Sequence, residues 1–216
     1  NNAHPHISRK KKIAIVHNGI IENYDSLKEG LISRGYNFKS ETDTEILVNL
    51  IEFIQDNLKV PLIEAVQQSL TQVIGAYSIA VMSLREPNKM IVAKKGSPLV
   101  IGVGKEEYFI ASDPSPFLKY TKRAIYLDDE EVVEISKNKL SIQTIDKKFK
   151  SPTIQKLTME LEEIEKGGFE TFMLKEIYEQ PKSIIDTLRG RIIKSKQEIK
   201  LRGFNESLNK FKKAKR

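Results

Sequence analysis

The sequence predicts a layered α+β domain, because its helical and strand-like segments occupy different parts of the chain. Amphipathic helical patterns dominate residues 24–72, and short runs rich in valine, isoleucine and tyrosine follow between residues 76 and 146. The length of 216 residues allows one large domain with an appendage. Hydrophobic residues make up 39% and charged residues 30% of the chain, which is typical of a globular protein.

The first elements are a strand and a helix. The apolar run Ile13–Val16 predicts a short buried strand. Tyr24–Arg34 then carries leucine and isoleucine at helical spacing. Gly35 follows at the position where a glycine commonly ends a helix, because glycine tolerates a left-handed backbone.

Two further helices are predicted by their N-terminal signals. Thr42 and Glu45 have the spacing of a capping box, and apolar residues follow them at helical spacing. Pro61 fits the start of the next helix, which we expect to run to Gln72.

The central part of the chain predicts antiparallel strands joined by tight turns. Glycine, proline, asparagine or aspartate separates the β-rich runs. A Gly-x-Gly at residues 102–104 lacks the third glycine of a dinucleotide-binding motif and instead predicts a hairpin turn. The runs are residues 76–84, 90–96, 99–104, 108–113, 124–129, 131–136 and 139–146.

The C-terminal part is predicted to be helical and then basic. A helical pattern begins at Ile154 and, after a Gly-Gly break, continues through Phe172–Leu188, where Pro181 kinks or restarts the helix. Residues 189–216 hold eleven Lys or Arg and two Glu, so the rest of the chain carries −2 of the net +7. This distribution indicates a basic linker rather than a nucleic-acid-binding face.

Several function classes are disfavoured by what the sequence lacks. No apolar run approaches the roughly 20 residues of a membrane span, and the first residues do not form a signal peptide. The absence of cysteine excludes disulfides, thiolate metal sites and a cysteine nucleophile within this sequence. His4 and His6 form a His-x-His pair that fits a polar loop better than a metal site, so we predict no metal and no cofactor. Arg9–Lys12 is interpreted as a solvated loop.

Asn18, Gly19 and Asp43 each admit two interpretations. Asn-Gly between apolar runs is typical of a hairpin turn. Alternatively, the asparagine amide and the glycine N–H are neighbouring donors at a strand end, and such a pair can hold an oxyanion. Asp43 fits either a helix-capping acid or a binding site for an ammonium group. Local pattern leaves these alternatives open.

Seven stretches resemble the glutaminase domain of the glucosamine-6-phosphate synthase family. They are NAHPH, HNGIIENY, SETDTE, GAYSIAVM, GSPLVIGVG, FIASD and FMLKEIYEQP, in the family's order over residues 2–192. The resemblance implies that the Asn18 side-chain amide and the Gly19 N–H form an oxyanion hole. It also implies that Asp43 binds the α-amino group of glutamine and that His4 lies near the entrance of the active site.

The resemblance further implies a fold and a domain order. Residues 1–188 would form a four-layer αββα sandwich of the N-terminal-nucleophile hydrolase type, and residues 189–216 a basic linker and the start of a sugar-isomerase domain. The family has an N-terminal cysteine nucleophile and an Arg-Trp-x-Thr-His stretch, which this sequence lacks. We therefore expect an N-terminally incomplete domain that is inactive by itself.

Three functions are weighed. In the first, the chain is the glutaminase part of a cytoplasmic enzyme that makes glucosamine 6-phosphate from fructose 6-phosphate and glutamine. Its partners would be glutamine, the sugar-isomerase domain of the same chain and further copies in a homo-oligomer, without nucleic acid or membrane. The second is a non-catalytic glutamine-binding or regulatory module. The third is a nucleic-acid-associated protein that uses the basic tail.

Overall fold

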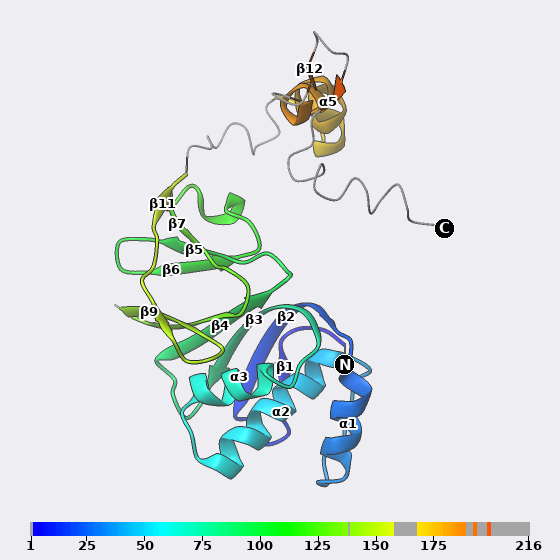
Figure 1. Ribbon diagram of the computed structural model, residues 1–216, viewed down its shortest axis with the longest axis vertical. Helices are drawn as coiled ribbons and strands as arrows, with labels where there is room; N and C mark the ends of the chain where they lie inside the picture. The colour runs from blue at the N-terminus through cyan, green and yellow to red at the C-terminus, as the bar shows by residue number, and fades with distance from the viewer. Residues whose placement is uncertain (1, 138, 158–167, 189–191, 194–197, 200–216) are drawn as a thin grey trace. The chain divides into compact units, whose positions relative to one another are not determined.

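The computed structural model describes residues 2–137, 139–157, 168–188, 192–193 and 198–199 (Figure 1). The chain divides into two compact units, residues 1–159 and 160–216. The second unit contains α5 (Phe172–Leu188) and the antiparallel pair β12 (Ile192–Ile193) and β13 (Glu198–Ile199). The predicted domain boundary after residue 188 stays a prediction, and most of the basic segment lies outside the described residues.

Two antiparallel sheets form the first unit, with strand orders β1-β2-β3-β4-β8-β9-β10 and β11-β7-β5-β6. The larger sheet contains β1 (His6–Ile7), β2 (Ile13–Ile21), β3 (Gly75–Ser83), β4 (Lys89–Lys95), β8 (Glu131–Ser136), β9 (Lys139–Thr144) and β10 (Phe149–Lys150). The smaller sheet contains β5 (Val100–Val103), β6 (Tyr108–Ala111), β7 (Arg123–Tyr126) and β11 (Gln155–Lys156), and a 3-10 helix, η1 (Ser115–Phe117), follows β6.

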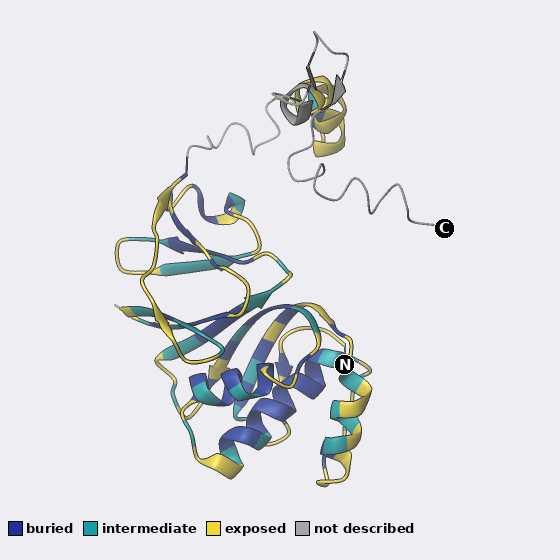
Figure 2. Ribbon diagram, in the orientation of Figure 1, coloured by how far each residue is buried: buried dark blue, intermediate teal, exposed yellow. Residues whose placement is uncertain are grey.

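Helices α1 (Tyr24–Ile32), α2 (Asp43–Leu58) and α3 (Leu62–Leu70) lie on one face of the larger sheet (Figure 1). Most of α2 and α3 is buried, whereas α1 is largely exposed or half-buried (Figure 2). The main core lies between these helices and the sheet, and a second core lies between the two sheets. The first unit therefore has three layers in its described residues: helices, the larger sheet and the smaller sheet.

The predicted elements are mostly confirmed, since all three N-terminal helices form and all seven β-rich runs form strands. The first and third helices end two residues before their predicted limits. The strand that begins at Ile13 is longer than predicted and continues to Ile21. The helix predicted from Ile154 is wrong at Gln155–Lys156, which form β11 and pair with β7. The rest of that predicted stretch, residues 158–167, lies outside the described residues.

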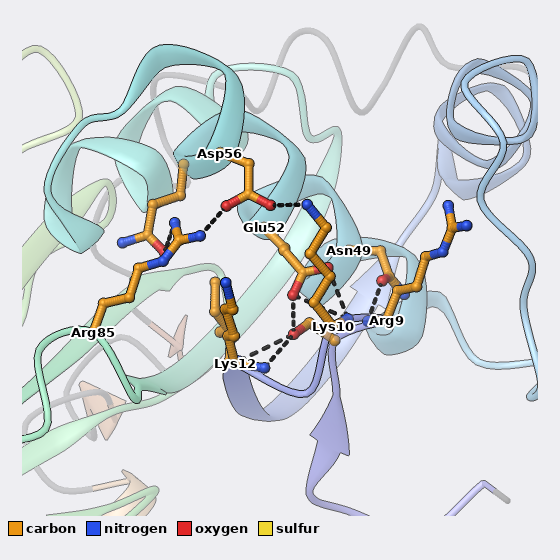
Figure 3. Close-up of polar contacts among 10 residues, drawn as sticks. Arg9, Lys10, Lys12, Asn49, Glu52, Asp56 and Arg85 are labelled. Carbon is orange, nitrogen blue, oxygen red and sulfur yellow. Dashed lines mark hydrogen bonds and ion pairs between the residues drawn. The ribbon is translucent and has the colours of Figure 1, made fainter.

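The turn between β1 and β2 is anchored to α2 by buried polar contacts (Figure 3). The Glu52 carboxylate accepts a hydrogen bond from the Ser8 hydroxyl at 2.6 Å and two from the Lys10 backbone N–H at 3.1 and 3.2 Å. The Asn49 side-chain oxygen accepts from the Arg9 backbone N–H at 2.8 Å. We call Ser8, Asn49 and Glu52 the turn anchor. The interpretation of Arg9–Lys12 as a solvated loop is confirmed, since Arg9, Lys10 and Lys11 are exposed, although the N–H groups of Arg9 and Lys10 are bonded to side chains of α2.

Asp56 adds an ionic contact to the same turn. Figure 3 shows its carboxylate between the Lys10 ammonium, at 2.6 Å, and the Arg85 guanidinium. Burial opposes ionisation of Asp56, but the hydrogen bonds from Lys10 and Arg85 outweigh it and hold the pKa of this carboxyl below its ordinary value. The turn anchor and Asp56 together fix β2 against α2.

Candidate functional site

A cleft of about 290 Å³ opens between the two sheets where β6 faces β2 and β3. Val16 and Asn18 of β2 and Ser78 and Ala80 of β3 line it from the larger sheet. These positions are two residues apart along their strands, so their side chains share the face that looks toward the smaller sheet. His4 also lines the cleft. Two of the predicted site residues, His4 and Asn18, are thus brought to one cavity.

Asn18 and Gly19 lie inside β2, so the hairpin-turn interpretation is wrong, as is the expectation of a strand end. They pair in register with Ser78 and Tyr77 of β3. Gly19 has φ +143°, and a Cβ atom on it would lie 2.2 Å from the Ala76 carbonyl oxygen. Only glycine permits this backbone conformation and this close approach without strain.

One edge of β2 is open beside Gly19, because β1 pairs only with an earlier part of β2 among the described residues. The Glu22 N–H donates to the Ile74 carbonyl oxygen, just before β3. The Ile21 N–H instead donates to the Asp43 carboxylate at 2.8 Å. Successive N–H groups of a strand point to opposite edges. The Gly19 N–H is therefore expected on the same edge as that of Ile21, where Asp43 lies.

Asp43 begins α2, as predicted, and Thr42 is the N-cap residue. The Thr42 hydroxyl accepts a hydrogen bond from the Glu45 N–H at 3.3 Å. The Glu45 carboxylate instead accepts from the N–H groups of Lys39 and Ser40, so only half of the predicted capping box forms. Burial raises the pKa of Glu45, but the bonds from Ser40 and Lys39 outweigh it and lower this pKa. Because Thr42 caps the helix, the Asp43 carboxylate is available for other contacts.

The three histidines of the sequence gather around the first turn of α2. His6 Nε2 lies 3.2 Å from the Thr42 hydroxyl oxygen. His4 Nε2 and His17 Nδ1 lie 3.4 and 3.0 Å from the Thr44 hydroxyl oxygen. Sequence reasoning gave no role to His17 or Thr44, because their contact joins residues far apart in the chain. Only their proximity to the Asn-Gly pair and to Asp43 could have indicated them.

Burial lowers the pKa of both His6 and His17, and it is the largest effect on each. At His17 the negative charge of Asp43 opposes this shift, while His4 adds to it. Both rings are therefore neutral near pH 7. Among the described residues, no group of three or more histidines and carboxylates is arranged to hold a metal ion. The described helices are also too short or too polar to span a membrane.

Comparison with known proteins decides the family. The model of the glutamine amidotransferase domain family matches residues 1–119, which is more than half of the chain. The chain belongs to the glutamine amidotransferase domain family. The Asn-Gly pair, Asp43 and His4 all lie within the matched part of this amidotransferase domain.

Two relatives of this glutamine amidotransferase domain carry the same name. Glutamine–fructose-6-phosphate aminotransferase [isomerizing] of Chlorobaculum tepidum is 47% identical over 216 residues, covering 100% of this chain and 35% of that protein. The protein of the same name from Bacteroides thetaiotaomicron is 49% identical over 192 residues, covering 88% of this chain and 31% of that protein. The chain spans about a third of the length of the curated relatives it matches.

Solved structures with a similar fold include another glutamine amidotransferase. The glutamine phosphoribosylpyrophosphate amidotransferase from B. subtilis has a TM-score of 0.57 and 26% identity, over 67% of this chain and 32% of that chain. A structure described as the allosteric regulatory enzyme of purine biosynthesis has a TM-score of 0.55 and 27% identity, over 65% of this chain and 30% of that chain. The mixed helix and sheet architecture of the amidotransferase domain is thus shared with a glutamine phosphoribosylpyrophosphate amidotransferase.

The four predicted site residues fall into two places on the amidotransferase domain. Asn18 and His4 line the cleft between the sheets, whereas Gly19 and Asp43 lie at the open edge of β2 and are not among the lining residues. Gly19 directly follows Asn18, so the two places adjoin. The chemical roles of these residues stay predictions.

Proposed function

We propose that this chain is the glutamine-hydrolysing part of a glutamine–fructose-6-phosphate aminotransferase. The parent enzyme would release ammonia from glutamine and transfer it to fructose 6-phosphate, which gives glucosamine 6-phosphate. The relatives at 47% and 49% identity, both named for this reaction, support the proposal. The observation that carries it is the open edge of β2. There Gly19, which lies against Ala76, is two residues from Ile21, whose N–H donates to the Asp43 carboxylate.

The proposal assigns the oxyanion hole to Asn18 and Gly19. During attack on the side-chain amide of glutamine, negative charge develops on the amide oxygen, and fixed donors stabilise that charge most in the transition state. Asn18 offers its side-chain amide on an exposed part of β2 and lines the cleft. The N–H of Gly19 is expected at the adjoining open edge. Since β3 holds this part of β2 in register, the backbone that carries both donors is fixed before substrate binds.

Asp43 would bind the α-ammonium group at the other end of the glutamine molecule. Its carboxylate is bonded to the Ile21 N–H, and a span of two strand residues corresponds to about 7 Å from Gly19. A side-chain exposure of 22% leaves the carboxylate accessible to a small cation. The amide and the ammonium of one glutamine could therefore be held on the same stretch of β2.

The sequence supplies no cysteine, so the proposal assigns to this chain the binding of substrate and the stabilisation of charge, and not the nucleophile. We also propose the finer features that the family resemblance implies. These are a fourth, helical layer beyond the smaller sheet, a sugar-isomerase domain in the same protein, a homo-oligomer and a cytoplasmic location.

Ammonia release from glutamine by the full-length protein tests this proposal. Asn18→Ala should lower kcat by about 10²–10³-fold and change KM little, because the amide acts mainly in the transition state. Asn49→Ala is the matched control, since it removes an asparagine of the turn anchor and should lower stability without changing kcat.

Two results would contradict the proposal. Wild-type kcat in Asn18→Ala would show that Asn18 is not an oxyanion donor. A full-length protein that binds glutamine but releases no ammonia would instead be a non-catalytic glutamine-binding module.

A further inference from the structure

We propose that His17 and Thr44 are positioning residues that orient the Asp43 carboxylate for binding the ammonium group of the substrate. In this relay a neutral His17 donates its Nδ1–H to the Thr44 hydroxyl oxygen, and the Thr44 hydroxyl hydrogen is donated to Asp43. The inference rests on the proposed function, because it assigns a task to residues around the predicted ammonium site.

The geometry provides a continuous set of contacts. His17 Nδ1 lies 3.0 Å from Thr44 Oγ1, and Thr44 Oγ1 lies 3.4 Å from Asp43 Oδ1. The other carboxylate oxygen, Oδ2, accepts from the Ile21 N–H at 2.8 Å. Each oxygen of Asp43 therefore has one donor, one on β2 and one on α2. These two donors restrict rotation of the carboxylate.

The His17 and Thr44 side chains of the relay are buried, and only Asp43 is partly exposed. Thr44 is 3% exposed, and the His17 side chain is 1% exposed. Hydrogen bonds in such a place are costly to lose, because water does not replace the missing partner. Asp43 is more exposed than either, so the relay runs from the interior to the surface where substrate arrives.

The chemistry of the three groups fixes the direction of the hydrogen bonds. A carboxylate only accepts, and the Thr44 hydroxyl has one hydrogen to donate. If that hydrogen were given to His17, Asp43 Oδ1 would face the lone pairs of Thr44. Because the contact with Asp43 uses the hydroxyl hydrogen of Thr44, the hydrogen between His17 and Thr44 is assigned to Nδ1.

A neutral His17 is also what ammonium binding requires. A positive imidazolium 3.9 Å from Asp43 would offset the charge that attracts the substrate. The titratable groups that face His17 are Asp43 from α2 and His4 and His6 from the N-terminal segment, and burial lowers the pKa of His17 despite Asp43. As pH falls through the pKa of His17, the ring becomes charged and glutamine should bind more weakly.

Kinetics of the full-length protein test the relay. Thr44→Val removes the hydroxyl and keeps the shape, so KM for glutamine should rise about tenfold, with kcat changed less than about twofold. Thr44→Ser keeps the hydroxyl and should retain most of the wild-type affinity. If Thr44→Val leaves KM unchanged while Asp43→Asn raises it, the relay is wrong and the proposed function stands. If Asp43→Asn also leaves KM unchanged, the ammonium site itself is wrong.

The protonation state can be measured without any substitution at Thr44. Nitrogen NMR of the full-length protein labelled at histidine should show His17 as the neutral Nδ1–H tautomer at pH 7.5, with the signal assigned by its loss in His17→Asn. The Nε2–H tautomer or an imidazolium at that pH would overturn the proposal. His17→Asn, which retains a donor near the Nδ1 position, should also abolish the rise of KM below pH 6.5. A rise that persists in this variant would place the titrating group elsewhere.

Discussion

Helix α2 contacts the β1–β2 region at two places, the turn anchor and the N-terminus of the helix. They differ in how far their polar side chains are buried and hydrogen-bonded. At the turn anchor, Glu52 is 1% exposed and its carboxylate is bonded to Ser8 and Lys10 (Figure 3). At the helix N-terminus, the Asp43 side chain is 22% exposed, and the nearby His17 Nε2 is buried without a hydrogen-bond partner in the described part of the chain. A closed and satisfied cluster stabilises the fold, whereas an accessible carboxylate keeps room for a ligand.

Gly19→Ala should have the largest effect, because it deforms the strand that joins the two places. The new Cβ would lie 2.2 Å from a backbone oxygen at φ +143°, so we expect a loss of about 3 kcal/mol of stability. Urea unfolding measures this. Gly30→Ala is the control, since its Cβ would meet only an Arg34 side-chain atom at 3.5 Å in helix α1. This control should gain about 0.5–1 kcal/mol. Equal stability of the two variants would contradict the close approach at Gly19.

Glu52→Gln should weaken the turn anchor and leave the N-terminus of α2, where Asp43 lies, intact. The change removes the charge from hydrogen bonds that involve Ser8 and Lys10, which we expect to cost about 2 kcal/mol. Chemical unfolding of the full-length protein measures the loss, and the KM for glutamine should stay at the wild-type value. A KM that rises with little loss of stability would mean that Glu52 serves the site and that the comparison between the two places is wrong.

Acidification should have a smaller effect on stability, and it should act first at the N-terminus of α2, where His6 and His17 lie. The pKa values of His6 and His17 lie below their ordinary 6.5, so the unfolded chain binds more protons as pH falls below 6.5. The stability present above pH 6.5 should therefore decrease through this range. The contribution of the Asp56 carboxyl, whose pKa is lowered, is lost only at more acidic pH.

Urea unfolding between pH 8 and pH 5 measures this dependence on pH. The double variant His6→Gln, His17→Asn should flatten the part between pH 6.5 and pH 5. An unchanged slope in the double variant would show that other groups cause the acid sensitivity.

The sequence predicted the N-terminus of α2 better than it predicted β2, because helix capping depends on residues that are close together in the chain. Thr42 and Glu45 are three residues apart, and the helix does begin at Asp43. Gly19, in contrast, is required by the approach of Ala76, which lies 57 residues further along the chain. An Asn-Gly that serves such an approach has the same local pattern as a hairpin turn.

The strands show the same limit at the level of the fold. Each β-rich run was recognisable from its own residues, yet the chain leaves the larger sheet after β4, forms β5, β6 and β7 in the smaller sheet, and returns at β8. Pairing of β4 with β8 depends on contacts between distant residues, such as Val92 with Val133, and no local pattern encodes it. Local patterns therefore revealed the strands but not their pairing into two sheets, which only the family resemblance implied.

The KM for glutamine of the Asp43→Asn full-length protein tests the central claim most directly. Loss of a charge-assisted contact with the substrate ammonium costs about 1.5–3 kcal/mol, so KM should rise by about 10- to 140-fold. The unfolding temperature should stay close to that of the wild type, because Thr42 caps the helix. A lowered unfolding temperature with an unchanged KM would show that Asp43 serves only the helix end, and would contradict the assignment of this edge of β2 as the glutamine site.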